Sequence, residues 1–192
     1  MPRLMLASAR ATTRRCGAGS RACSAARSCS SAAPSSAAIA PTTVLGDWTT
    51  NLLSLRPQPL VLAMNERSLL CVVVPASPGS ELGPRVRAAV AELLLSIGVP
   101  MHRVTEECVA MESMAIGATA SRAVLGCMND AVVQLGAYPV GRKDGPSLGD
   151  AALHLAGNIY SLGDYQKPWV RALELFGVEG RPVPIVRSAR LH

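Results

Sequence analysis

The chain has 192 residues, 49% of them hydrophobic and 17% charged, which is typical of one globular domain with a tail. Its net charge of +6 comes entirely from residues 1–46, which contain six arginines and no acidic residue. The neutral balance of residues 47–192 argues against nucleic-acid binding, which needs a basic face on the folded part. No stretch is long and apolar enough to predict a membrane-spanning helix, so we expect no membrane partner.

Residues 1–42 are predicted to form a disordered tail rich in Arg, Ser and Ala. Ala and Ser supply 20 of the first 40 residues, and such a segment buries too little apolar surface to offset its ordering entropy. This acid-free composition is found in organellar transit peptides, and it is also what a GC-rich gene translated from an early start would encode. Both interpretations stay open. The longest apolar run, residues 4–7, is too short for a secretory signal.

The six cysteines predict free thiols, with no metal and no cofactor. Three lie in the tail, at spacings that no zinc module uses. The other three have apolar neighbours, as small buried side chains do: Cys71, Cys108 and Cys127. An odd number in the folded part argues against a disulfide framework and predicts a reducing compartment, the cytoplasm.

Three short apolar runs open the folded part and predict an antiparallel meander. They cover residues 48–55, 60–64 and 69–74 and are rich in Leu and Val. The segments between them contain Arg-Pro-Gln-Pro and Asn-Glu-Arg, which are typical of turns. Short runs joined by such turns favour neighbouring antiparallel strands.

The clearest helical pattern follows the meander. Apolar residues recur at spacings of four, four, three and four from Leu82 to Ile97, so they form one stripe that we expect to cover a face of the meander. Pro84 suits the first turn of this helix, and Gly98 suits its C-terminal stop.

Further helices are predicted over residues 121–135, 147–159 and 168–176. Ser121 is the expected N-cap of the first. Ser147 opens the second, and Gly177 stops the third.

Residues 101–118 fit two patterns. Val104, Cys108 and Met111 fit a helix that Thr105 caps, while an extended segment through Ile116 fits nearly as well. The helical pattern fits these residues slightly better than the extended one.

Strands first and helices after them are the pattern of an α+β domain. We therefore predict one α+β domain over residues 43–178, in which an antiparallel three-stranded meander is followed by about four helices packed on it. Residues 179–192 are predicted to be a frayed C-terminal tail.

Four motifs are spread along the folded part. They read LGDWTTNLL at 45–53, NERSLL at 65–70, SRAVLGCMND at 121–130 and LGDYQKP at 162–168. Together they resemble an uncharacterised bacterial family known only as a domain of unknown function. Members of that family usually carry Tyr and Ala where this chain has Thr49 and Thr50, and Ser where it has Cys127. They also begin with a Cys-Thr-x-Lys-Leu-Leu-like element that this chain lacks. The resemblance implies a bacterial, cytoplasmic single domain and supplies no reaction.

The same motifs hold the candidate functional residues. A carboxylate and an amide beside an arginine can bind phosphate or orient water, although turns, caps and ion pairs explain most of these side chains as well. Asn129 and Asp130 are the hardest to explain structurally, because both are poor helix formers in the middle of a predicted helix. The candidate cluster comprises Asp47, Trp48, Asn51, Asn65, Glu66, Arg67, Arg122, Asn129 and Asp130.

No catalytic residue and no metal ligand is assigned. His102 and His154 neighbour no Ser or Cys in a nucleophile arrangement, and a surface or core role is expected for both. The acidic residues near 106 to 112 have no histidine close by that would complete a metal site. Glu106, Glu107 and Glu112 are therefore interpreted as a solvated face.

We predict a small binding module, for another protein or for a homo-oligomer. The alternative is a small hydrolase or nuclease with a polar site around Asp47, Arg122, Asn129 and Asp130. The hydrolase requires these side chains to converge in a concave pocket. The binding module predicts that they serve caps and turns, with an exposed aliphatic face elsewhere.

Overall fold

The computed structural model describes residues 3–7, 43–54, 58–78, 81–113, 115–117, 121–138, 140, 145–160 and 166–179. Within them the predicted α+β fold and its antiparallel meander are confirmed. The meander consists of β2 (Trp48–Leu53), β3 (Leu60–Asn65) and β4 (Cys71–Pro75), each antiparallel to the next.

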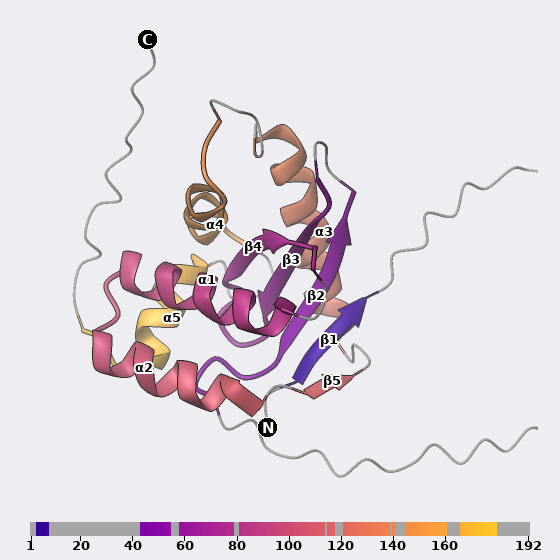
Figure 1. The fold of residues 1–192 in the computed structure, drawn as a ribbon. Helices are drawn as coiled ribbons and strands as arrows, with labels where there is room; N and C mark the ends of the chain where they lie inside the picture. The colour runs from indigo at the N-terminus through magenta and orange to yellow at the C-terminus, as the bar shows by residue number, and fades with distance from the viewer. Residues whose placement is uncertain are drawn as a thin grey trace, which may run out of the picture.

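Two further strands extend the meander into a five-stranded sheet of order β4-β3-β2-β1-β5 (Figure 1). β1 (Arg3–Ala7) lies parallel to β2, and β5 (Ala115–Gly117) lies parallel to β1. The expectation of a disordered tail did not foresee β1, which is formed by the short apolar run of that segment. The other residues of 1–42, like residues 180–192 of the predicted C-terminal tail, lie outside the described residues.

Five α-helices occur in the described part of the chain. Residues 101–118, which fitted both a helix and an extended segment, form a helix, a short 3-10 turn (Met111–Ser113) and β5. The helical interpretation is therefore correct for the first part of the segment, and the extended one for the last part. The bounds are α1 Leu82–Ser96, α2 Met101–Ala110, α3 Arg122–Ala137, α4 Leu148–Ala156 and α5 Pro168–Leu175.

The ends of these helices follow from local chemistry. Ser121 and Ser147 accept hydrogen bonds from backbone N–H groups of the first turns of α3 and α4, as N-caps do. Gly98 and Gly177 follow α1 and α5 with positive φ angles of 97° and 64°. The predicted cap Thr105 is wrong: α2 begins at Met101, and the Thr105 hydroxyl donates to a carbonyl one turn back.

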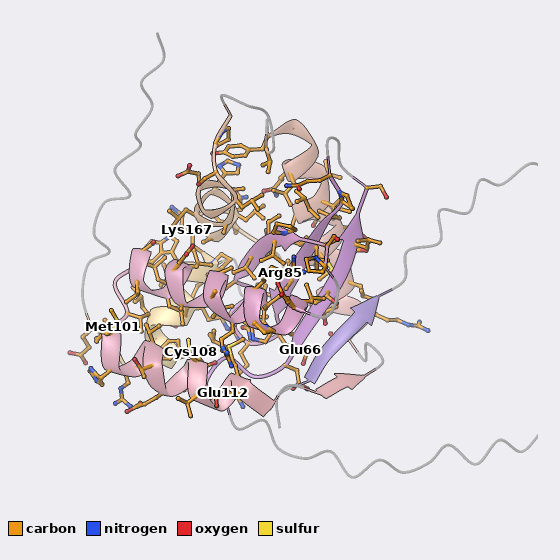
Figure 2. All side chains as sticks on the ribbon, viewed as in Figure 1. Glu66, Arg85, Met101, Cys108, Glu112 and Lys167 are labelled. Carbon is orange, nitrogen blue, oxygen red and sulfur yellow. The ribbon has the colours of Figure 1, made fainter. Side chains whose placement is uncertain are left out.

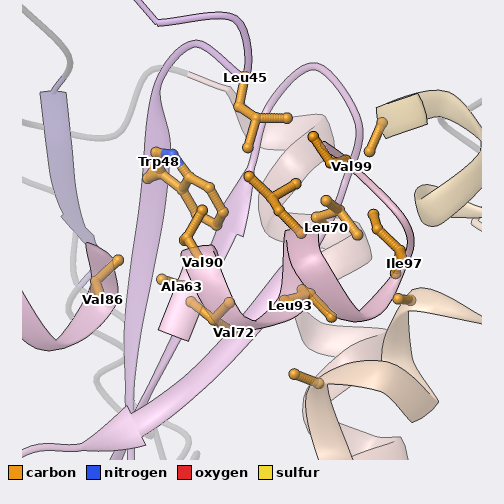
Figure 3. Close-up of a cluster of buried hydrophobic side chains, with 14 of the residues drawn as sticks. Leu45, Trp48, Ala63, Leu70, Val72, Val86, Val90, Leu93, Ile97 and Val99 are labelled. Atoms are coloured by element: carbon orange, nitrogen blue, oxygen red, sulfur yellow. The ribbon is translucent and has the colours of Figure 1, made fainter. Parts of the chain in front are cut away.

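One face of the sheet is covered by α1, α2 and α5 (Figure 1). Val86 and Val90 of α1 meet Trp48 of β2 and Val72 of β4 in this core (Figure 3). The predicted α1 stripe therefore covers the meander as expected. The aliphatic side chains bury apolar surface that is worth about 25 cal/mol for each Å² removed from water.

The opposite face of the sheet is covered by α3. Met128 and Val124 of α3 share a second core with Leu62 and Met64 of β3. Helix α4 contributes to both cores, because it lies against β4. The sheet is thus a middle layer. The motifs at 45–53 and 65–70 meet where β2 begins and β3 ends, because Trp48 pairs with Asn65.

Candidate functional site

The segment 43–47, which leads into β2, is held by three polar side chains that we call the clamp: Asn65, Arg67 and Glu107. The Glu107 carboxylate accepts the backbone N–H groups of Val44 and Leu45, at 2.7 and 3.1 Å. Asn65 donates its side-chain amide to the carbonyl of Leu45, and Arg67 donates to that of Val44 at 3.0 Å. The amide oxygen of Asn65 also accepts from Ser68, at its backbone N–H and its hydroxyl. The clamp therefore explains Asn65 and Arg67 as residues that fix the fold.

The prediction that Glu107 belongs to a solvated face is wrong. Only 2% of its surface is exposed, whereas Glu106 and Glu112 are exposed as expected. Burial raises the pKa of the Glu107 carboxyl, and the two backbone donors and the Arg67 guanidinium oppose that rise. The spacing from Val104 to Glu107 to Met111 places this acid on the buried stripe of α2, and that spacing was the signal in the sequence.

Asp47 and Glu66 lie together where β2 begins and β3 ends. The Glu66 backbone N–H donates to the Asp47 carbonyl at 3.1 Å. Burial raises the pKa of the Glu66 carboxyl, and the Asp47 carboxylate raises it further. One Glu66 oxygen, Oε1, is buried and has no hydrogen-bond partner among the described residues.

Strand register places two more polar residues on the α3 side of the sheet. Thr49 pairs with Met64 and Asn51 pairs with Leu62, and directly opposite residues share a face. Both side chains are buried, and Thr49 Oγ1 and Asn51 Oδ1 have no hydrogen-bond partner in the described part of the chain. Trp48, directly before Thr49, points the other way, into the core with α1. The candidate residues of β2 are thus divided between the two faces.

Arg122, Asn129 and Asp130 are all exposed on α3. Arg122 stands in the first turn, about 12 Å along the helix axis from Asp130 at a rise of 1.5 Å per residue. None of these residues lines the cavity that lies between α2 and α5. The convergence that the hydrolase hypothesis requires of them is therefore not found on this helix.

The outer face of α3 has an unusual composition. Five exposed residues recur at spacings of four, three, four and three, so they lie on the side opposite the buried stripe of the helix. A methyl group added at either of the two glycines would meet no atom within 4 Å. The outer face comprises Arg122, Gly126, Asn129, Val133 and Gly136, with Asp130 at its edge.

A shallow cavity of about 450 Å³ lies between α2 and the end of α5. Val44, Leu175 and Phe176 give it apolar walls, and the buried Glu107 lines it as well. Arg103 and Glu106 at its border form an exposed ion pair of 3.3 Å. Glu106 is paired with Arg103, and Glu107 accepts the backbone N–H groups of segment 43–47, so the lining favours no single class of ligand.

Large apolar side chains are exposed on several elements rather than on one. Met101 and Val109 of α2 are 64% and 60% exposed, and Val133 of α3 is 73% exposed. Figure 2 shows Met101 and Glu112 at opposite ends of α2 and its 3-10 extension. The other exposed large apolar residues are Val44, Leu52, Leu95, Ile159 and Leu175.

The described cysteines and histidines form no arrangement typical of a nucleophile or a metal site. Cys71 and Cys127 are buried as predicted, whereas Cys108 is only half-buried, and none of the three forms a disulfide. Burial raises the pKa of the Cys71 thiol to about 12, which suppresses a thiolate nucleophile. His102 is exposed, and the ring of His154 stacks on Tyr138 with centroids 4.7 Å apart. The described residues contain no group of three or more His, Cys, Asp or Glu that could hold a metal, and none of their helices is long and apolar enough to cross a membrane.

Comparison with known proteins gives one match. The family model described as a domain of unknown function (DUF6933) matches residues 26–171. No curated protein and no solved structure matches the chain. The resemblance to a family of unknown function is confirmed, and the match extends to residues before the segment 43–47.

Proposed function

The chain belongs to the DUF6933 family of domains of unknown function, and we propose from the geometry of α3 that it is a protein-binding module. One observation supports this proposal above the others. The outer face of α3 carries residues that lower helix stability, although all of them are exposed and no described packing contact requires them.

The cost to the helix is large for a single element. Each interior glycine is about 1 kcal/mol less favourable than Ala, and Asn and Asp each cost up to about 0.7 kcal/mol. Gly126, Asn129 and Asp130 together therefore cost α3 about 2 kcal/mol, while Gly136 lies close to the end of the helix. Arg122 adds to this, because a positive charge in the first turn opposes the helix dipole.

A binding partner would explain why the outer face of α3 carries these helix-destabilising residues. Small residues let another backbone approach a helix closely, and Val133 supplies an apolar contact that is otherwise left in water. Arg, Asn and Asp around this strip supply directional hydrogen bonds, which specify a partner. The hydrolase alternative has no comparable support, because its residues are divided between the start of β2 and the solvent side of α3.

The proposal is tested with a variant that strengthens the helix and blocks its outer face. Gly126→Leu adds a bulky side chain at an open position and improves helix propensity. Ala88→Leu, at an exposed position of α1, is the matched control. Each variant is purified from the native host and examined by native mass spectrometry and thermal unfolding.

Wild type and Ala88→Leu are expected to carry the additional mass of a bound polypeptide. Gly126→Leu is expected to lose that mass while melting at an equal or higher temperature. A bare subunit for the wild type, or an unchanged complex for Gly126→Leu, contradicts the proposal.

We also propose that the domain works in the bacterial cytoplasm. The support is chemical: the buried thiols of Cys71 and Cys127 form no disulfide and are packed among apolar side chains. Mass spectrometry of the protein alkylated directly in cells tests this. Full reduction of both thiols is expected, and a disulfide at either contradicts it.

A further inference from the structure

We infer that the partner of α3 is a second copy of this chain, packed antiparallel so that the two α3 helices cross at Gly126. The inference rests on the proposed function and names the partner for that surface. It follows from the order of charges along the outer face.

Arg122 lies four residues before Gly126, and Asp130 lies four residues after it. At a rise of 1.5 Å per residue, the two charges stand about 6 Å to either side of the glycine. A two-fold axis through Gly126 therefore brings Arg122 of one copy opposite Asp130 of the other, and does so twice. The face is self-complementary in this orientation alone, because a parallel pair places like charges together.

The crossing point suits close contact. Gly126 has no side chain, and no atom lies within 4 Å of the position that its Cβ would take. Two backbones can therefore approach there more closely than at ordinary residues, for which interaxial distances are about 8–10 Å. Asn129 lies one turn from the crossing on the same face, where its amide can donate and accept across the interface.

The charged residues are available for such pairing. Both are exposed, and neither takes part in the ion pairs found among the described residues, Arg87–Glu112 and Arg103–Glu106. Within one copy, Arg122 and Asp130 are about 12 Å apart along the helix axis, so they do not pair with each other.

The test uses two charge reversals in the full chain, Arg122→Asp and Asp130→Arg. Each reversal alone replaces two opposite-charge contacts with two like-charge contacts, so the dimer dissociation constant is expected to rise about tenfold to a hundredfold. The two variants mixed together restore both opposite-charge contacts. Sedimentation equilibrium and native mass spectrometry are expected to show a weakened homodimer for each variant and a 1:1 heterodimer for the mixture.

Three results overturn the inference. The first is a wild-type chain that stays monomeric at the highest concentration reached, and the second is a dimer that both reversals leave unchanged. The third is a mixture that associates no better than its components. Folding is monitored by circular dichroism, and Arg122→Asp is expected to melt no lower than wild type because an acid in the first turn favours the helix.

The outcomes separate the inference from the proposed function. A monomeric wild type that still binds another polypeptide, and loses it in Gly126→Leu, keeps the binding function and rejects self-association. Loss of both the dimer and any such partner rejects the two proposals together.

Discussion

The clamp and the outer face of α3 are both rich in polar residues, yet the fold uses them in opposite ways. In the clamp, the Asn65 and Glu107 side chains are buried and make hydrogen bonds to the segment 43–47. On α3, Asn129 and Asp130 are exposed and lower the stability of the helix that carries them. The same residue types therefore hold the fold together in one place and, in the other, lie on an exposed surface where we propose that a partner binds.

The difference teaches how to interpret a polar motif. A buried polar group must find a partner within the molecule, so its presence is explained once the hydrogen bonds are counted. An exposed residue that weakens a helix has no such explanation within the fold. Paired substitutions, one in each region, test the distinction.

The largest effect is expected at the clamp carboxylate. Glu107→Ala leaves the buried N–H group of Leu45 and the part-buried N–H group of Val44 without an acceptor, so the free energy of unfolding should fall by about 3 kcal/mol. Glu106→Ala, at the adjacent exposed position, should change it by about 0.5 kcal/mol or less. Urea denaturation of both variants measures this. Equal effects would show that the clamp does not hold segment 43–47.

A pair of asparagines gives the next largest contrast. Asn65→Ala removes the bond to Leu45 and the bonds from Ser68, and should cost about 2 kcal/mol of unfolding free energy. Asn129→Ala replaces a poor helix former at an exposed position and should stabilise the chain by about 0.5 kcal/mol. Thermal and urea unfolding report the two signs. A loss of stability in Asn129→Ala would contradict the assignment of Asn129 to a free surface.

Replacing a glycine with Ala should change the stability in opposite directions at Gly46 and at Gly126. Gly46 has a φ angle of 79°, and an added Cβ would lie 3.2 Å from Arg67 Nε, so Gly46→Ala should destabilise by about 1–2 kcal/mol. Gly126→Ala should stabilise by up to about 1 kcal/mol, because the position is helical and open. Differential scanning calorimetry at low protein concentration measures both. Destabilisation in Gly126→Ala would mean that the glycine serves the monomer.

The smallest effect concerns pH. The pKa of Glu107 is raised in the folded chain, so between its ordinary value near 4.5 and that raised value the folded state holds a proton that the unfolded state has lost. Stability from this group is therefore complete below the ordinary value and falls as pH rises through the raised one. Glu107→Gln, which carries no titratable group at this position, should flatten this dependence. Urea midpoints of wild type and Glu107→Gln across acidic pH measure the two slopes, and a stability difference in favour of wild type that grows as pH rises through this window contradicts the sign.

Much of the fold was predictable because its signals are local. The α1 stripe, the caps Ser121 and Ser147 and the turn at residues 65–67 depend on neighbours within a few residues. The strand β1 was not predicted, and β5 was anticipated only by the extended interpretation of residues 101–118, because each needs a partner distant in sequence and neither is longer than five residues. The burial of Glu107 was missed because a charged residue is read as solvent-facing unless a specific partner is known.

For the candidate site, the sequence identified the right motifs and left their roles undecided. It placed Asn65, Arg67, Asn129 and Asp130 in one candidate cluster and singled out the last two only as poor helix formers. Only the tertiary structure separated them, because hydrogen bonding and exposure depend on which distant segments lie against each side chain. The sequence by itself determined the α+β class, the meander and most helix boundaries, since periodicity and capping act over a few residues. The tertiary structure alone decided which polar residues hold the segment 43–47 and which face the solvent on α3.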